Sequence, residues 1–472
     1  MRRRHRLRRL LPTGAILVTA IIVAVVAGDG GHPRLPKAPV LGPGRPGDPF
    51  AYRPGRSAEF IARASAGNAH VLFTKSPGGV LATAARVAGF GAAIDRAAAG
   101  TGINPRLLEA IVFLESAGDP EAIAGADPAN AAGLTQIVAS TGQSLLGMPI
   151  DLAASRRLSA QIRAAGAAGQ ADRVRRLQAA RARVDPRFDP GQALAATVRY
   201  LEIARDHFGR PDLAVESYHM GIGNLQSVLG AYDGGAPVPY VQLYFDTAPE
   251  HHPAAYQLLS SFGDDSWTYY WRVLAAQQIM SLYRGDRPAL QRLTMLQTDS
   301  DSAAEVLHPP DLTPQFATPA SLYDGYSART IAPFPSDPAA LGLAYGPGFA
   351  YLGHRLGVPA AVYRGLRPQA LALLVELAAS VRSMAGGASP LTVTGAVLDR
   401  QAQQLLGIDD PPAAAGWSFT IARTYVDEAQ RAALQAMLDR LTSLNLIAWQ
   451  RYPAEIEITV AADAPRVIAS GP

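Results

Sequence analysis

Apolar residues recur at three- and four-residue intervals almost without interruption over residues 81–285. This spacing places them on one face of an α-helix. Several segments also open with a helix-start signal, as at Asn104-Pro105, where a capping side chain precedes a proline at the first helical position. Because few strand-like runs interrupt this pattern, the sequence predicts a mainly α-helical domain over residues 81–290.

The first 28 residues join a basic block to an apolar run. The segment MRRRHRLRRLLPTG is strongly cationic, and the following AILVTAIIVAVVAG carries no charge. This order keeps the N-terminus in the cytoplasm and sends the rest of the chain across the membrane. We expect residues 1–28 to form a signal anchor with a transmembrane helix, which would tether the protein in the cell envelope with its domains on the extracytoplasmic side. Because the run is shorter than the roughly 20 residues of a usual span, a cleaved signal peptide and a secreted protein remain the alternative.

Changes in composition divide the rest of the chain. Proline and glycine are so dense after residue 28 that residues 29–80 are expected to form an extended stalk. Turn residues dominate residues 291–347, which predicts a linker. Residues 348–472 alternate helix-like and strand-like runs, among them LTVTGAVL, WSFTIAR and AEIEITVA, and this alternation predicts a small α+β domain.

An Ala/Arg-rich segment interrupts the helical domain at residues 153–184. Gly166 and Gly169 lie near its middle, so we expect an inserted helical hairpin. Its arginines could contact an acidic polymer, but a solvated helix face is the simpler interpretation.

Composition excludes several classes of function. The chain has no cysteine, and it therefore has no disulfides, thiol nucleophiles or thiolate metal sites. The net charge is only +4, and the globular part shows no arginine or lysine stripe with interleaved aromatic residues. Nucleic acid is therefore not an expected partner.

The segment AIVFLESAGDP, residues 110–120, delivers a carboxylate to the end of an apolar helix. Gly118 and Pro120 predict that the helix ends near Gly118, which puts Glu115 in the last turn. The helix dipole disfavours a negative charge there, and burial would add to the effect, so the pKa of Glu115 should rise toward that of a usable general acid. Taken alone, a glutamate at a helix end is more often incidental, and the assignment depends on further motifs.

Two further motifs follow in order. The sequence reads GLTQI from Gly133 and AVESYHMGIGNL from Ala214. With the preceding Glu115-Ser116, this order of motifs resembles the lytic transglycosylases of the soluble-lytic-transglycosylase (SLT) type, a lysozyme-like family that cleaves bacterial peptidoglycan. The resemblance covers roughly residues 87–285. It implies a lysozyme-like catalytic domain, peptidoglycan glycan strands as the substrate, proteins of cell-wall synthesis as candidate partners, and no metal or other cofactor.

The resemblance also implies roles for individual residues. Glu115 matches the single catalytic acid/base of the family, and Ser116 matches the serine that supports it. Gln136 matches a glutamine that contacts the N-acetyl groups of the substrate, and Gly133 shapes the turn beside it. Tyr218 matches the tyrosine near the catalytic acid.

The third motif is less regular than the first two. Tyr269, in WTYYWRVL, corresponds only loosely to a later tyrosine of the substrate cleft. His219 stands where the family has asparagine, and MGIG replaces the usual AGPG. Neither departure touches the acid, so we expect activity to survive with altered substrate contacts.

The number of carboxylates distinguishes two reactions. With Glu115 alone, the resemblance implies proton donation to the bond between MurNAc and GlcNAc, followed by attack of the sugar's own 6-hydroxyl and formation of a 1,6-anhydro end. If Asp119, Glu121 or Asp127 supplied a second carboxylate to position water, the enzyme would be a hydrolase similar to goose-type lysozyme. A non-catalytic wall-binding scaffold is the alternative outside the enzymes.

The C-terminal domain resembles the zinc D-Ala-D-Ala carboxypeptidase fold over SPLTVTGAVL, GWSFTIAR and AEIEITV. Zinc in that family needs two histidines and an aspartate. Gly416 is kept, but Thr420 stands where the aspartate belongs, Glu457 is on the final strand, and no histidine follows His354. The resemblance therefore implies a degenerate relative without zinc, which would bind peptidoglycan stems or act only as a scaffold.

Overall fold

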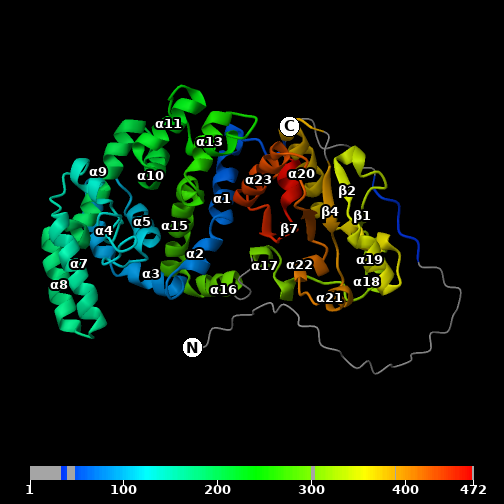
Figure 1. Cartoon of the computed structure of the whole chain (residues 1–472), viewed down its shortest axis with the longest axis horizontal. Coiled ribbons are helices and arrows are strands. Elements are labelled where there is room, and N and C mark those ends of the chain that lie inside the picture. The colour runs from blue at the N-terminus through cyan, green and yellow to red at the C-terminus, as the bar shows by residue number, and fades with distance from the viewer. Residues whose placement is uncertain (1–32, 40–47, 299–302, 388–389, 470–472) are drawn as a thin grey trace. The chain divides into compact units, whose positions relative to one another are not determined.

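The computed structural model describes residues 33–39, 48–298, 303–387 and 390–469 (Figure 1). Leu35–Pro472 forms one compact unit, distinct from Met1–Arg34. The predicted transmembrane helix at residues 1–28 lies outside the described residues. None of the helices in the described residues is long and apolar enough to cross a membrane.

Helices dominate the described residues up to 298. They are α1 (Ser57–Gly67), α2 (His70–Lys75), α3 (Val80–Ala88), α4 (Gly91–Ala98), α5 (Pro105–Ser116), α6 (Ala139–Ser144), α7 (Leu152–Ala167), α8 (Ala171–Val184), α9 (Pro190–Phe208), α10 (Pro211–Met220), α11 (Ile222–Asp233), α12 (Tyr240–Asp246), α13 (Pro253–Ser261), α14 (Asp264–Trp267), α15 (Tyr269–Gly285) and α16 (Arg287–Thr298). Within residues 48–298, pairing of extended backbone is limited to two isolated bridges at Ala132. The predicted mainly helical character of this part is confirmed.

Folded structure begins earlier than the sequence predicts. Helices α1 and α2 lie inside the interval expected to be a stalk, and Phe60 of α1 is fully buried. The dense proline and glycine end at Pro54, and the following SAEFIARASAG has the spacing of an amphipathic helix. The predicted stalk therefore differs from the structure over these two helices.

Helix α5 is buried along most of its length. Its start is capped by Asn104, whose side-chain oxygen accepts a hydrogen bond from the backbone N–H of Arg106 at 2.9 Å. Leu108, Ile111 and Val112 are fully buried, and the helix packs against α3, α4, α9 and α15. Full burial of one such side chain stabilises the fold by about 1.5–3 kcal/mol, so α5 is a rigid support for the residues at its C-terminal end.

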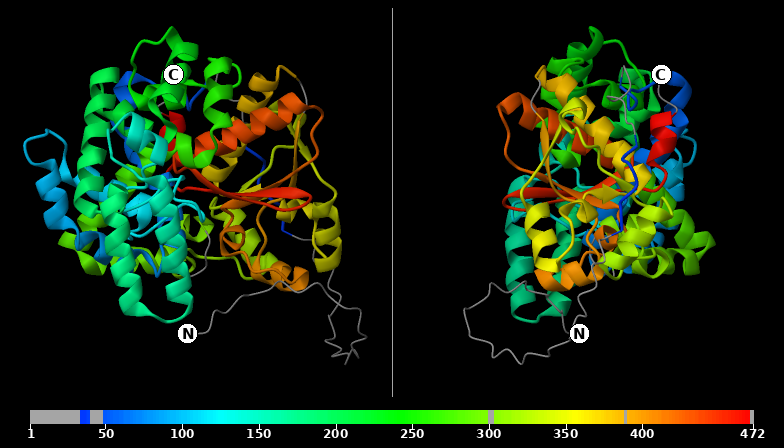
Figure 2. Two further views of the ribbon diagram at one scale, coloured as in Figure 1. Left: turned by 60° about the vertical axis from the view of Figure 1, so that its left-hand side comes forward. Right: turned by 90° about the vertical axis from the view of Figure 1, so that its right-hand side faces the viewer.

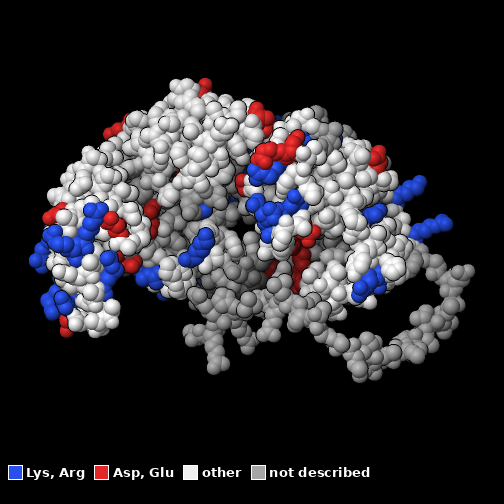
Figure 3. Space-filling model, in the orientation of Figure 1, with Lys and Arg blue, Asp and Glu red and all other residues white. Residues whose placement is uncertain are grey.

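Helices α7 and α8 occupy the segment for which the sequence predicts a helical hairpin, and they run side by side (Figure 2). Gly169, with a φ of 68°, lies in the turn between them. Arginine side chains gather over this hairpin (Figure 3).

A mixed five-stranded sheet forms the core of the C-terminal part. Its strands, in spatial order, are β2 (Leu343–Tyr345), β4 (Leu391–Gly395), β5 (Ser418–Ala422), β7 (Glu455–Val460) and β6 (Ile447–Arg451). Strand β2 is parallel to β4, and the other neighbours are antiparallel. Helices α20 (Pro368–Ala385) and α23 (Glu428–Ser443) pack against each other, α20 also contacts β7, and α23 also contacts β6. This mixed sheet with helices is the α+β architecture that the sequence predicts.

The interval expected to be a linker contains regular structure. It holds α17 (Ala303–Leu307), α18 (Pro319–Ser327), β1 (Ala332–Pro333) and β2, an edge strand of the sheet. The remaining α-helices and strands of the C-terminal part are α19 (Gly348–Leu356), β3 (Gly365–Leu366), which pairs with β1, α21 (Arg400–Leu406), α22 (Pro411–Ala414) and α24 (Ala464–Ala469). The turn residues of this interval therefore separate short helices and strands that pack on the sheet domain, and the interval is not an unstructured linker.

Helix α1 contacts both the helical part and the sheet domain. Its Phe60 ring meets Phe245 edge to face, with ring centroids 4.9 Å apart, and Arg63 pairs with Asp463 at 2.8 Å. At its C-terminal end, a Cβ on Gly67 would lie 2.2 Å from the carbonyl oxygen of Thr442. A residue with a side chain cannot fit at this position without moving α1 away from α23.

Candidate active site

Glu115 lies in the last turn of α5, as the sequence predicts, and its side chain is partly buried. The hydroxyl of Tyr269, at the start of α15, donates a hydrogen bond to Glu115 Oε1 at 2.7 Å. Burial raises the pKa of Glu115 to about 7, although the hydrogen bond from Tyr269 favours the carboxylate and opposes the rise. Glu115 can therefore gain and lose a proton near neutral pH.

The end of α5 is fixed from a neighbouring helix. Ala117 and Gly118 both have left-handed backbone conformations, with φ of 53° and 77°. Arg86 of α3 donates from Nε to the carbonyl oxygen of Ala117 at 2.9 Å, which places a cation at the negative end of the helix. A Cβ on Gly118 would lie 2.9 Å from the Cβ of Arg86, so glycine allows this close approach.

The loop that carries GLTQI packs directly on the end of α5. Ser116 Oγ donates to the carbonyl oxygen of Leu134 at 2.7 Å. Gly133 has a φ of 79°, and a Cβ there would lie 1.8 Å from the carbonyl oxygen of Arg187. The structure therefore gives Ser116 and Gly133 contacts that fix the loop beside Glu115.

Gln136 is held in an unusual conformation for a residue with a side chain. Its φ is 52°, and its Nε2 donates to the carbonyl oxygens of Gly133 at 2.8 Å and Ala122 at 3.2 Å. Because both partners are acceptors, the amide nitrogen must face them and the acceptor Oε1 points elsewhere. An oxygen presented in this way can receive an N–H group, such as that of an acetamido substituent.

Tyr218 contacts the same loop and does not bond to Glu115 directly. Its hydroxyl, on α10, donates to the carbonyl oxygen of Thr135 at 2.8 Å and lies 3.1 Å from Thr197 Oγ1. Its ring is stacked with that of Tyr269, with centroids 6.4 Å apart. Burial, followed by the charge of Glu115, raises the pKa of both tyrosines, so they remain hydrogen-bond donors. Tyr269, whose match to the family is only loose, is thus the tyrosine that donates a hydrogen bond to Glu115.

His219, the main departure from the family motif, also lies at this tyrosine. Its ring is stacked on Tyr269 with centroids 5.2 Å apart, and its Nδ1 lies 3.2 Å from Ser266 Oγ. The side chain is exposed. The substitution therefore changes the surface beside Glu115 and leaves the hydrogen bond to Glu115 intact.

Glu216 is a buried acid of this site that no sequence motif predicts. This carboxylate is fully buried on α10, and its Oε2 accepts from the backbone N–H of Tyr270 at 2.9 Å. Burial raises the pKa of Glu216 well above its ordinary range. Because Tyr270 is the second residue of α15, Glu216 caps the helix that presents Tyr269. The only signal for it in the sequence is an acid within the apolar segment LAVES.

The three acidic residues of the loop after α5 all have partners. Arg156 of α7 forms a two-point ion pair with Asp127, at 2.8 and 2.9 Å, and Arg181 of α8 pairs with Glu121 at 2.5 Å. Asp119 Oδ1 accepts from the backbone N–H of Glu121 at 2.9 Å. Arg181 is buried at its contact, whereas the other arginines of the hairpin, Arg156 included, are exposed, in agreement with the predicted solvated face.

Residues 92–159 match the family described as Transglycosylase SLT domain. The matched segment contains Glu115, Ser116, Gly133 and Gln136, whereas Tyr218 and Tyr269 follow it in the chain. The chain thus carries an SLT domain, and this domain implies a lytic transglycosylase that acts on peptidoglycan. No curated protein matches the chain.

Proposed function

We propose that the protein cleaves the bond between MurNAc and GlcNAc in peptidoglycan and leaves 1,6-anhydro-MurNAc ends, with Glu115 as the single general acid and base. The observation that carries this proposal is the placement of Glu115. It lies at the end of a buried helix inside the SLT match, it bonds to Tyr269, and burial raises its pKa to about 7. A pKa near the working pH suits a group that must both give and take a proton.

The reaction then follows in two proton transfers. Protonated Glu115 donates its proton to the glycosidic oxygen, which leaves with GlcNAc, and the N-acetyl group of MurNAc stabilises the positive anomeric carbon. The Glu115 carboxylate next removes the proton from the 6-hydroxyl of the same sugar, and that oxygen bonds to C1. Glu115 is again protonated, and no water is consumed. Between the two steps, the hydrogen bond from Tyr269 stabilises the carboxylate.

The contacts of the loop acids favour this reaction over hydrolysis. A hydrolase with two carboxylates needs the second one free to act on water or on the sugar. Glu121 and Asp127 are each paired with an arginine, and the Asp119 carboxylate caps its own loop. These pairs support a mechanism with one carboxylate, in which Gln136 Oε1 binds an N-acetyl group and Ser116 positions the loop.

For the C-terminal domain we propose a peptidase-like fold without zinc that binds peptidoglycan stems or serves as a scaffold. Thr420 lies opposite Glu457 in the pairing of β5 with β7, and its Oγ1 is 2.8 Å from Thr394 Oγ1. A hydroxyl in this network does not replace an aspartate ligand. We further propose that the N-terminal segment directs both domains to the outer side of the membrane.

The experiment is digestion of purified peptidoglycan with the full-length chain, followed by mass analysis of the released muropeptides. We expect anhydro products from the wild type and from Glu121→Gln and Asp127→Asn, and none from Glu115→Gln. Reducing-end products that disappear in Glu121→Gln or Asp127→Asn would instead establish a lysozyme-type hydrolase. A wild-type protein that binds peptidoglycan without releasing products would establish the scaffold.

A further inference from the structure

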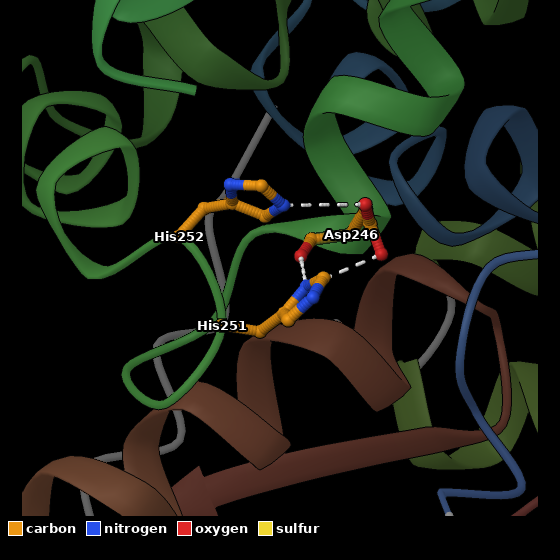
Figure 4. A group of neighbouring side chains, drawn as sticks. All are labelled: Asp246, His251 and His252. Carbon is orange, nitrogen blue, oxygen red and sulfur yellow. Dashed lines mark hydrogen bonds and ion pairs between the residues drawn. The ribbon is translucent and has the colours of Figure 1, made fainter. Parts of the chain in front are cut away.

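Three side chains that commonly bind metals meet between α12 and α13 (Figure 4). Asp246 ends α12, and His251 and His252 precede Pro253 at the start of α13. His251 Nδ1 lies 3.4 Å from Asp246 Oδ1, and His252 Nε2 lies 3.7 Å from Asp246 Oδ2. The candidate ligand atoms of the three residues all lie within 4.8 Å of one another.

These separations are somewhat wider than, or comparable to, those around a tetrahedral zinc ion. Zinc binds imidazole nitrogen and carboxylate oxygen at about 2.0–2.2 Å, which places neighbouring ligand atoms about 3.3–3.5 Å apart. The distances of 3.4 and 3.7 Å reach different oxygens of Asp246, and the candidate ligand atoms of the three residues lie within 4.8 Å of one another, so a bound ion would either use both oxygens or draw these atoms together by up to roughly 1.5 Å. His251 Nδ1 also lies 2.7 Å from the backbone oxygen of Asp246, so a bound ion would replace the proton now shared at that contact.

The carboxylate and one imidazole are held in place by a second layer of contacts. Tyr232 Oη donates to Asp246 Oδ2 at 2.6 Å, and Gln242 Nε2 donates to Tyr232 Oη at 3.1 Å. The rings of Tyr232 and His252 lie 4.1 Å apart. Support of this kind orients first ligands in metal sites.

The backbone at His252 adds a further constraint. Its φ is 55°, in the left-handed region that residues with a Cβ rarely adopt, and the next residue is Pro253. Such a conformation persists only where the surrounding contacts stabilise it. Here it accompanies a ring that faces the Asp246 carboxylate (Figure 4).

We propose that Asp246, His251 and His252 bind a divalent transition-metal ion of the zinc type. Two imidazoles and one carboxylate favour zinc and its neighbours over magnesium or calcium, which prefer oxygen ligands throughout. The side chains are 27 %, 59 % and 28 % exposed in the order Asp246, His251 and His252, so an ion can enter and keep water at its open positions. The proposal does not rest on the transglycosylase reaction.

A metal here would join the end of α12 to the start of α13 beside the contact with the sheet domain. Arg440 of α23 donates to the carbonyl oxygen of Phe245 at 3.2 Å, and it also forms an ion pair with Asp48. An ion that binds only the folded chain raises its stability. We therefore expect metal binding to stabilise this junction in addition to the loop itself.

The test uses the full-length chain without a polyhistidine tag, stripped with a chelator and titrated with zinc chloride in a calorimeter. We expect one saturable site and a rise in the melting temperature. The double variant His251→Asn/His252→Asn should lose at least tenfold in affinity and show no rise. The control His354→Asn removes an exposed histidine elsewhere and should bind zinc as the wild type does.

A second measurement tests the site in case the double histidine variant folds poorly. Tyr232→Phe keeps all three proposed ligands and removes only the bond to Asp246, so it should weaken binding while retaining the site. Cobalt bound in place of zinc should give a visible absorption spectrum that is changed in Tyr232→Phe and absent in Asp246→Asn. The absence of saturable zinc binding by the wild type, or unchanged affinity in the double histidine variant, would overturn the proposal. Equal affinity for magnesium would overturn it as well.

Discussion

Replacing Tyr269 with phenylalanine should move the pH dependence of cleavage to higher pH. The substitution removes one atom, the hydroxyl oxygen that lies 2.7 Å from Glu115 Oε1, and leaves the buried ring in place. A hydrogen bond to a charged group contributes about 1.5–3 kcal/mol, and about 1.4 kcal/mol corresponds to a tenfold change in a proton equilibrium. The pKa of Glu115, which is about 7 in the wild type, should therefore rise by roughly one to two pH units in the variant.

The assay is the pH profile of kcat/KM, which reports the groups of the free enzyme. Glu115 must carry a proton to start the reaction, so activity should fall as the pH rises through its pKa. In Tyr269→Phe this fall should occur at least about one pH unit higher than in the wild type. The maximal rate should also drop, because the carboxylate formed between the two steps loses its donor.

Tyr218→Phe is the matched control. Its hydroxyl bonds to the carbonyl oxygen of Thr135 and lies close to Thr197, so its removal should lower activity without moving the profile comparably. Equal displacement of the profile in both variants, or no displacement in Tyr269→Phe, would refute the assignment of Tyr269 as the residue that tunes Glu115.

Three further predictions concern stability and positioning. Gly133→Ala should lower the free energy of unfolding by about 2–4 kcal/mol in urea denaturation, because a Cβ would lie 1.8 Å from a carbonyl oxygen. The control is Gly166→Ala, which lies inside α7 with open space around it and should be neutral or slightly stabilising. Glu216→Ala should lower kcat and reduce the free energy of unfolding by about 1–3 kcal/mol, because the backbone N–H of Tyr270 loses its acceptor. Glu216→Gln keeps an acceptor oxygen and should retain most of the activity and most of the stability. Equal losses in the two variants would contradict the capping role. Because folding raises the pKa of Glu115 from 4.5 to about 7, the wild type should lose stability as the pH rises through this range. Below pH 4.5, Glu115→Gln should have the same free energy of unfolding as the wild type, and above pH 7 its free energy of unfolding should be higher by up to about 3 kcal/mol. Urea denaturation at a series of pH values measures both.

The elements that the sequence predicts well are those with local signals. Helix α5 has a capping asparagine, a proline at its first position and a glycine after its end, and its bounds follow from these residues. Strands β4, β5 and β7 follow from alternating apolar runs. The acid at the end of α5 could likewise be found, because its motifs are short and contiguous.

The partners of these elements were not predictable in the same way. Tyr269 is 154 positions from Glu115, and Arg181 is 60 positions from Glu121, so no local pattern links either pair. Glu216 was not predicted for the same reason, because its capping contact with α15 depends on how α10 packs against α15. Strand β6 was missed for another reason, because it directly follows the helical run of α23. Local periodicity specifies elements, and long-range packing specifies which side chains meet.

The central claim is that Glu115 alone performs both proton transfers and that water takes no part. The most direct measurement is digestion of peptidoglycan in water labelled with heavy oxygen, followed by mass analysis of the new glycan ends. The account predicts anhydro ends that carry no label from the wild type and no new ends from Glu115→Gln. Labelled reducing ends, or anhydro ends that persist in Glu115→Gln, would contradict it.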